Sequence, residues 1–468
     1  MREIINVSVS HRSNHLITQF YNCLEPLLHD ADQENDVFLN PNIDKVSKTV
    51  SYTPRALLWD AKLGNGSLGT YQYVSENDYA DTLDSEQGAT AKTAHRVQTH
   101  DRIRKSPYQL ALDQGATVLP KINDEIAKYW SDYSKLIYDP SSFNTLQDWY
   151  HDAANQQKAP NFQNLRQVYF DNYETGSNQF RENYSNEFFD SNLHQQLEKC
   201  DSLQGFNIIT ELDNGWGGFS SSMLLELKDE LPKVSYHTYG WNQDDVCSLK
   251  EPVHSTKTKF QMLCNKIRAT IALSQESDLF FPLYANTKEA FWRSTGETVL
   301  LFDSVNSVFH GSRKQAATNS NMRKMSHLTN ALTLGESKRN IVSKLNVDEY
   351  NSFSFYDRMP LYKNSKKPSH TFTQCEIDRV NHKESSMFHF TTYPWTNSDT
   401  IPDTHHSCAE SVIGVTEKPR DVLKTWEDLV SRYFRYDSDR EEIKDHLGTL
   451  SLEYEHGWYD DDDSDLDL

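Results

Sequence analysis

Residues 200–232 read CDSLQGFNIITELDNGWGGFSSSMLLELKDELP, and this stretch decides the fold class. The apolar run that ends at Ile209 is typical of a buried parallel strand, and Asp213-Asn214-Gly215 break it. Ser220–Ser222 then predict a helix N-cap, followed by apolar residues at helical spacing: Met223, Leu224, Leu227 and Leu231. A strand, a glycine-rich turn and a helix in this order are typical of α/β proteins. Such a turn can bring backbone N–H groups close to a phosphate.

Three further segments accompany this one. Residues 4–9 predict a strand, followed by a polar turn over residues 10–14 and then a helix. Residues 52–60, YTPRALLWD, predict a strand that ends in a carboxylate, and residues 174–185, ETGSNQFRENYS, predict a polar loop that contains a glycine. A glycine turn alone is a weak signal, because many such turns bind nothing. Several blocks in a fixed order are far more specific.

Together these blocks resemble the tubulin superfamily, in the order in which that family has them. The opening MREI, Asn14 in the first turn and PRALLWD resemble tubulin's MREI, its GQCGNQ turn and its PRAILVD. CDSLQGF nearly reproduces tubulin's CDCLQGF, and Leu263–Leu283 resembles tubulin's interdomain helix and the strand after it. The resemblance ends near residue 310. It implies an α/β protein with a Rossmann-type N-terminal nucleotide-binding domain, degenerate in its loops, and a second α/β domain.

The loops that bind nucleotide in tubulin are altered here. Asp213, Asn214 and Trp216 stand where tubulin's GGGTGSG has glycines; a carboxylate would repel a phosphate, and an indole would crowd the backbone. The acidic residue of tubulin's interdomain helix, which activates water, aligns with Lys266 or Ile267. Neither an ammonium nor an alkyl group replaces that carboxylate. We therefore expect no GTP hydrolysis, no catalytic residue and no enzyme activity.

The resemblance also says where GTP or GDP would lie if the chain binds one. Asn14 would face the base or ribose, and Asp60 would lie near a water on magnesium. The residues expected to contact the phosphates or to close the other side of the site are Gly217, Gly218, Ser220, Gly176 and Asn178. No residue is predicted to ligate a metal directly.

A tubulin-like chain with a degenerate nucleotide loop and a long insert resembles the Misato family, above all its fungal branch. That resemblance implies a non-catalytic factor in mitochondrial distribution and morphology, in the partitioning of mitochondria and in the inheritance of mitochondrial DNA, acting through protein partners. Animal members of the family imply an alternative, a cytosolic assembly factor for tubulin that works with a chaperonin. A nucleotide-binding, GTPase-like switch is a further alternative.

Composition narrows the choice of partners and compartment. The chain has 468 residues, a formal net charge of −21 and 37% hydrophobic residues, which is typical of a globular protein. Because nucleic-acid phosphates would be repelled by this charge, we expect no direct binding of nucleic acid. No stretch is apolar enough to span a bilayer, and the first residues read as a core strand rather than an import presequence. We expect a cytoplasmic protein that associates peripherally with the outer surface of the mitochondrion.

The six cysteines have no zinc spacing, and DTHHSC at residues 403–408 reads as a polar loop. Apolar residues at helical spacing predict helices over residues 122–138 and after Pro419. The aromatic residues between residues 146 and 173 are expected to pack on the main sheet rather than to bind a partner. The expected organisation is a tubulin-like domain over 1–255 with a family-specific insert at about 75–170, an interdomain helix over 256–275, a second α/β domain over 276–435 and an acidic tail over 436–468.

Overall fold

The structure is a computed structural model, and it describes residues 3–29, 35–44, 46–68, 103–243, 256–309, 324–335, 338–348, 351–362, 370–379, 388–402, 408–435 and 437–456. The first part of the expected insert, most of the DTHHSC segment and the end of the acidic tail lie outside these residues.

An eight-stranded sheet forms the body of the N-terminal part, in the order β10-β9-β8-β1-β4-β5-β6-β7. The strands from β10 to β5 are parallel, and β6 and β7 continue the sheet as antiparallel strands. Residues such as Ile5, Leu57 and Ile208 are fully buried, as expected for parallel strands that are covered on both faces. The strands are β1 (Glu3–Val9), β4 (Ala56–Lys62), β5 (Phe143–Tyr150), β6 (Asn161–Phe162), β7 (Leu165–Tyr169), β8 (Leu203–Glu211), β9 (Ser235–Asn242) and β10 (Leu279–Tyr284).

A second sheet has five strands in the order β12-β11-β15-β13-β14, and a small hairpin pairs β2 with β3. Together with the large sheet and its helices, this confirms the predicted α/β fold class with a second sheet-containing part. The strands are β2 (Leu39–Ile43), β3 (Val50–Pro54), β11 (Lys344–Val347), β12 (Asn351–Ser352), β13 (Thr371–Asp378), β14 (Phe388–Thr391) and β15 (Glu410–Thr416).

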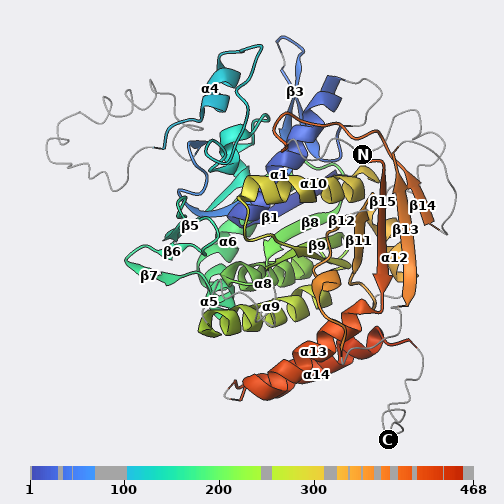
Figure 1. Ribbon diagram of the computed structural model, residues 1–468. Helices are drawn as coiled ribbons and strands as arrows, with labels where there is room; N and C mark the ends of the chain where they lie inside the picture. Colours follow the sequence, from blue (N-terminus) through green and yellow to red (C-terminus); the bar gives the residue numbers. More distant parts are fainter. Residues whose placement is uncertain are drawn as a thin grey trace, which may run out of the picture.

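Helices cover both faces of the large sheet. Figure 1 shows α1 (His11–Leu24) and α10 (Phe291–Ser307) on one side of it, and α8 (Gly215–Glu230) and α9 (Thr256–Glu276) on the other. Among the described residues, no helix combines the length and the apolar run that crossing a bilayer requires. The other helices are α4 (Pro107–Asp113), α5 (Tyr173–Gln179), α6 (Ser185–Glu187), α7 (His194–Leu197), α12 (Met325–Thr333), α13 (Lys418–Tyr433) and α14 (Arg440–Glu453).

The connection between the two sheets differs from the expected one. Helix α9 covers the residues expected to form the interdomain helix, but the strand after it, β10, pairs with β9 in the large sheet. The domain boundary expected at residue 276 is therefore corrected, since residues 279–284 belong to the large sheet. The next helix, α10, packs on α1 and also reaches the second sheet, where Asp303 and Arg379 form a buried ion pair of 2.6 Å.

Two helices begin earlier than predicted, because polar residues upstream cap them. The side chain of Ser10 accepts a hydrogen bond from the backbone N–H of Ser13, so the predicted polar turn is largely the first turn of α1. In the same way Asn214 caps α8 through the N–H of Trp216, which places Ser220–Ser222 inside the helix. The polar loop predicted over residues 174–185 is also helical, formed by α5 and a π-helical turn.

Residues 122–138 do not form the predicted helix. Only Trp130–Tyr133 form a short 3-10 helix there, and their side chains are buried. The aromatic residues that follow pack as expected: the Trp149 ring lies 5.1 Å from that of Phe162 and 5.0 Å from that of Phe170. The amphipathic helix predicted after Pro419 is confirmed as α13.

Two glycines let α5 lie directly against the start of α8. A Cβ added to Gly176 would lie 1.7 Å from the carbonyl oxygen of Gly215, and one added to Gly218 would lie 1.8 Å from that of Tyr173. No real Cβ approaches backbone this closely. These two glycines, which the resemblance assigned to nucleotide binding, therefore bring the two helix backbones into contact.

We predict that Gly218→Ala destabilises the chain by about 1–3 kcal/mol, the usual cost of overpacking, because the new methyl group would push α5 away from α8. Urea unfolding followed by circular dichroism measures this change. Gly448→Ala in α14 is the matched control, since nothing lies within 4 Å of its Cβ position and alanine favours a helix. Equal stability of Gly218→Ala and the control would show that the helix contact is loose.

Candidate functional site at the strand ends

The polar residues of the N-terminal part gather where neighbouring parallel strands end. Residues 10–14 follow β1, Asp60 lies near the end of β4, and Glu211 ends β8, with residues 212–214 directly after it. In open α/β sheets, ligands bind at the carboxyl ends of the strands. We call this group of residues the strand-end cluster, and its contacts decide what it can bind.

Asp60 and Asn14, two of the residues predicted from the resemblance, are in direct contact. The Asn14 amide donates to Asp60 Oδ2 at 3.1 Å and to the carbonyl of Trp59 at 3.0 Å, while its own oxygen accepts from Ser8 Oγ at 2.6 Å. The amide of Asn14 is thus engaged within the protein, and its side chain is fully buried. It holds the Asp60 carboxylate in place.

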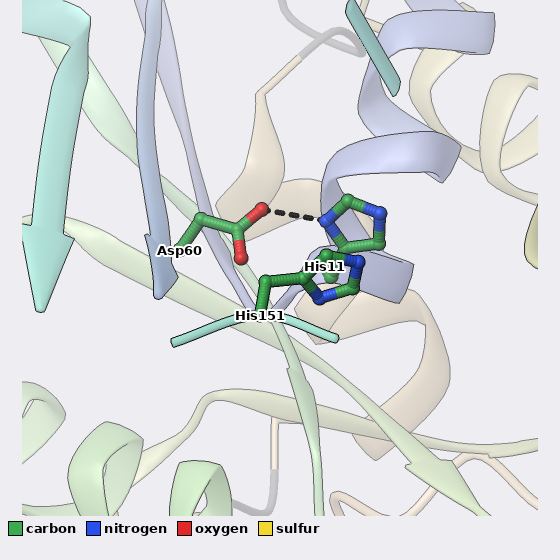
Figure 2. Close-up of side chains that lie close together, drawn as sticks. All are labelled: His11, Asp60 and His151. Carbon is green, nitrogen blue, oxygen red and sulfur yellow. Dashed lines mark hydrogen bonds and ion pairs between the residues drawn. The ribbon is translucent and has the colours of Figure 1, made fainter. Parts of the chain in front are cut away.

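Three histidines lie on one side of this carboxylate, in a chain of contacts that begins at His11. His11 Nδ1 lies 2.8 Å from Asp60 Oδ2, and the ring of His151 stacks on that of His11 with centroids 3.8 Å apart (Figure 2). His15, one turn after His11, places its Nε2 3.3 Å from His11 Nε2 and its Nδ1 2.6 Å from the Tyr133 hydroxyl. These side chains come from the start of α1, the end of β4 and the residue after β5.

The histidines and the carboxylate shift one another's protonation. Burial by itself would raise the pKa of Asp60, but the charge and hydrogen bond of His11 outweigh it, and the pKa lies below its usual value. Enclosure of the ring and the neighbouring His11 lower the pKa of His151 to about 3. Burial likewise lowers the pKa of His15. Around neutral pH the Asp60 carboxylate is therefore ionised, and the nearby His15 and His151 rings are neutral.

A second group of charges lies between β1 and β8. Arg12 is fully buried, and its Nε lies 3.2 Å from Glu211 Oε1. The guanidinium also donates to Gln157 Oε1 at 2.7 Å and lies 4.3 Å from the ring centroid of Phe291. The other oxygen of Glu211 accepts from the Asn214 side chain at 2.6 Å. Both charges are thus satisfied within the chain.

The two departures from the tubulin pattern, Asp213 and Lys266, are ion-paired with each other. Lys266 Nζ lies 3.2 Å from Asp213 Oδ1, and each side chain is 1% exposed. Lys266 also donates to the carbonyl of Gln243 at 3.1 Å, while Gln243 N–H donates to Asp213 Oδ2 at 2.6 Å. Burial raises the pKa of Asp213, and Lys266 partly offsets that shift. The Lys266 ammonium is therefore buried and bound to groups of its own chain.

The other residues that were predicted to contact a nucleotide lie in helix contacts, in the core or on the surface. Gly217 and Gly218 lie in the first turn of α8, and Ser220 Oγ donates to Thr210 Oγ1 at 2.7 Å inside the core. Gly176 packs on Gly215, whereas Asn178 is exposed on α5. Trp216 is buried against Phe170, with ring centroids 5.0 Å apart. The structure thus joins Asn14 to Asp60, and joins Gly176 to the start of α8, without making one polar cradle of all seven residues.

Sequence reasoning missed the histidines and the two ion pairs. His11 and His15 are four residues apart and share one face of α1, a spacing that could have singled them out. His151 is remote in the sequence, and only the pairing of β5 with β4 brings it to Asp60. The partnership of Asp213 with Lys266 depends likewise on how α9 packs against α8.

Comparisons with known proteins agree with this fold. A family model described as the Misato Segment II tubulin-like domain matches residues 2–114, and one described as a Tubulin domain matches residues 119–313. The second match begins inside the segment at about 75–170 that was expected to be an insert. Because β5 to β7 also lie in the large sheet, the part of that segment from residue 119 belongs to the tubulin-like region.

Curated relatives span the whole chain. The chain is 42% identical to Protein DML1 of Eremothecium gossypii over 99% of both chains. It is 32% identical to Protein DML1 of Debaryomyces hansenii over 81% of this chain and 70% of that one. The identity to Protein DML1 of Yarrowia lipolytica is 26% over the full length of both.

We predict that Lys266→Met destabilises the chain by about 3–5 kcal/mol, because it leaves the Asp213 carboxylate buried without its counter-charge. Asp213→Asn combined with Lys266→Met should recover part of this loss, since no uncompensated charge remains. Urea unfolding of the two single variants and the double variant, analysed as a double-mutant cycle, measures the coupling. Strict additivity of the two changes would contradict the ion pair.

Proposed function

The chain belongs to the Misato family, and from this premise we propose that it is a non-catalytic, tubulin-related factor that partitions mitochondria and supports inheritance of mitochondrial DNA. It acts through protein contacts, in the cytoplasm and at the outer surface of the mitochondrion. The mitochondrial part of the proposal rests on the family resemblance. The non-catalytic part is carried by one observation, the buried Asp213–Lys266 ion pair at the strand ends.

This ion pair bears on nucleotide chemistry in two ways. It places a carboxylate at the start of α8, where the helix dipole would otherwise favour an anion such as a phosphate. It also binds Lys266, one of the two residues that align with tubulin's catalytic acid, to the carbonyl of Gln243 within its own chain. Both features favour a scaffold over a GTPase.

The contacts of Arg12 also favour a scaffold over a nucleotide-binding protein. Arg12, in the first turn of α1, is already paired with Glu211, and its guanidinium lies over the ring of Phe291. Arg12 also donates to Ser294, which lines a cavity of about 270 Å³ together with Tyr284 and Arg358.

We predict that cells depleted of the chain lose the normal distribution of their mitochondria and lose mitochondrial DNA over successive divisions, while tubulin levels stay constant. Both the wild-type gene and Asn178→Ala should restore these properties, because a scaffold does not need the exposed Asn178 to close a nucleotide site. Fluorescence microscopy of the organelle, quantitative PCR of its DNA and immunoblots of tubulin provide the readouts.

Gly218→Ala is the control that should fail to rescue fully, since it disturbs the packing of α5 on α8. Loss of tubulin before any mitochondrial change would contradict the proposal and favour an assembly factor for tubulin. Failure of Asn178→Ala at normal protein levels would favour a nucleotide-controlled switch.

A further inference from the structure

We propose that His11, Asp60 and His151 form a binding site for a divalent transition-metal ion, with Zn²⁺ as the best fit. The three side chains each offer one ligand atom, and these atoms lie within 4.8 Å of one another. Figure 2 shows them converging from three separate segments of the chain. The inference is independent of the mitochondrial role, because it concerns what stabilises the strand-end cluster.

To reach a zinc site, the stacked rings of His11 and His151 have to turn so that one nitrogen of each points at the same ion. Zn²⁺ binds imidazole nitrogen and carboxylate oxygen at about 2.0–2.2 Å, so tetrahedral ligand atoms lie about 3.4 Å apart. His11 Nδ1 and Asp60 Oδ2, at 2.8 Å, would open slightly to admit the ion between them. No two of the ligand atoms lie more than 4.8 Å apart, so the longest separation has to close by at most about 1.4 Å.

A second, independent observation points to a ligand. Nε2 of His151 is enclosed by the protein and has no hydrogen-bond partner among the described residues. A buried polar atom without a partner is costly, and such atoms in folded proteins often mark an ion or a bound water. A metal ion ligated through Nε2 would give this nitrogen a partner.

The charges of the cluster suit a cation. Metal ligation requires neutral imidazoles and an ionised carboxylate. Two nitrogens and one oxygen leave a fourth position for water, and imidazole ligands favour zinc and similar metals over magnesium.

The surroundings also provide the outer contacts that metal-binding histidines usually have. With Nδ1 of His11 on the metal, its Nε2 faces the carbonyl of Lys128 at 3.4 Å and Nε2 of His15 at 3.3 Å. Gly64 leaves room for the carboxylate, since a Cβ there would lie 2.1 Å from Asp60 Oδ1. A bound ion would tie α1, β4 and the segment after β5 together.

The test is a calorimetric titration of the full chain with Zn²⁺, after a chelator has removed any bound metal. We expect one Zn²⁺ per chain at this site and a loss of affinity of at least about 100-fold in His151→Gln, at the upper end of what loss of an outer contact costs. His389→Gln is the matched control, because His389 lies 2.8 Å from Asp378 in the second sheet without belonging to the three-residue cluster. Its affinity should equal that of the wild type.

X-ray absorption of the zinc-loaded wild-type chain decides the case if His151→Gln fails to fold. Two imidazole ligands with oxygen in the remaining positions support the proposal. Sulfur ligands, unchanged affinity in a folded His151→Gln chain, or no binding by the wild type would overturn it. In the last case the histidines and Asp60 form a hydrogen-bonded core that binds no metal.

Discussion

The strand-end region is governed by the cost of burying charge. An isolated ion in a protein interior is unstable by several kcal/mol, and only a close partner of opposite charge with further hydrogen bonds offsets that cost. Arg12, Glu211, Asp213 and Lys266 all lie at the ends of the central strands, and each has such a partner. None of the four residues can change alone, because its partner would remain buried and unpaired. The positions of β1, β8 and α9 are thus coupled through their charges.

This coupling explains why the departures from the tubulin pattern occur together. An aspartate in a phosphate loop and a lysine in a helix look unrelated in the sequence, yet Asp213 and Lys266 compensate each other in the fold. The glycines that remain have a role in packing, since Gly176 and Gly218 bring α5 against α8. The tubulin-like architecture therefore persists with different contacts at its centre.

Much of the fold was predictable because it depends on local patterns. The apolar runs of β1 and β8 and the amphipathic stripe of α13 are strong periodic signals, and the structure contains all three. The helix predicted over residues 122–138 was wrong, because the buried aromatic residues of that segment, such as Trp130 and Tyr133, pack through tertiary contacts in irregular backbone. The starts of α1 and α8 were misplaced, because the capping side chains of Ser10 and Asn214 were read as parts of turns.

The candidate site was less predictable, because its contacts join residues far apart in the sequence. The resemblance assigned Asn14 and Asp60 to a nucleotide site, and in the structure their side chains are hydrogen-bonded to each other. The pairing of Lys266 with Asp213, and of His151 with His11, depends on strand order and helix packing, which no spacing in the chain encodes. The location of α9 between two strands of one sheet was missed for the same reason.

We propose that internal ion pairs occupy the place of a nucleotide. The most direct measurement is the nucleotide content of the purified chain, obtained by denaturing it and separating the supernatant by ion-exchange chromatography. We expect no GTP or GDP in the supernatant, even after the chain has been incubated with magnesium and GTP. One nucleotide per chain would contradict it, and would mean that the altered loops still bind phosphates.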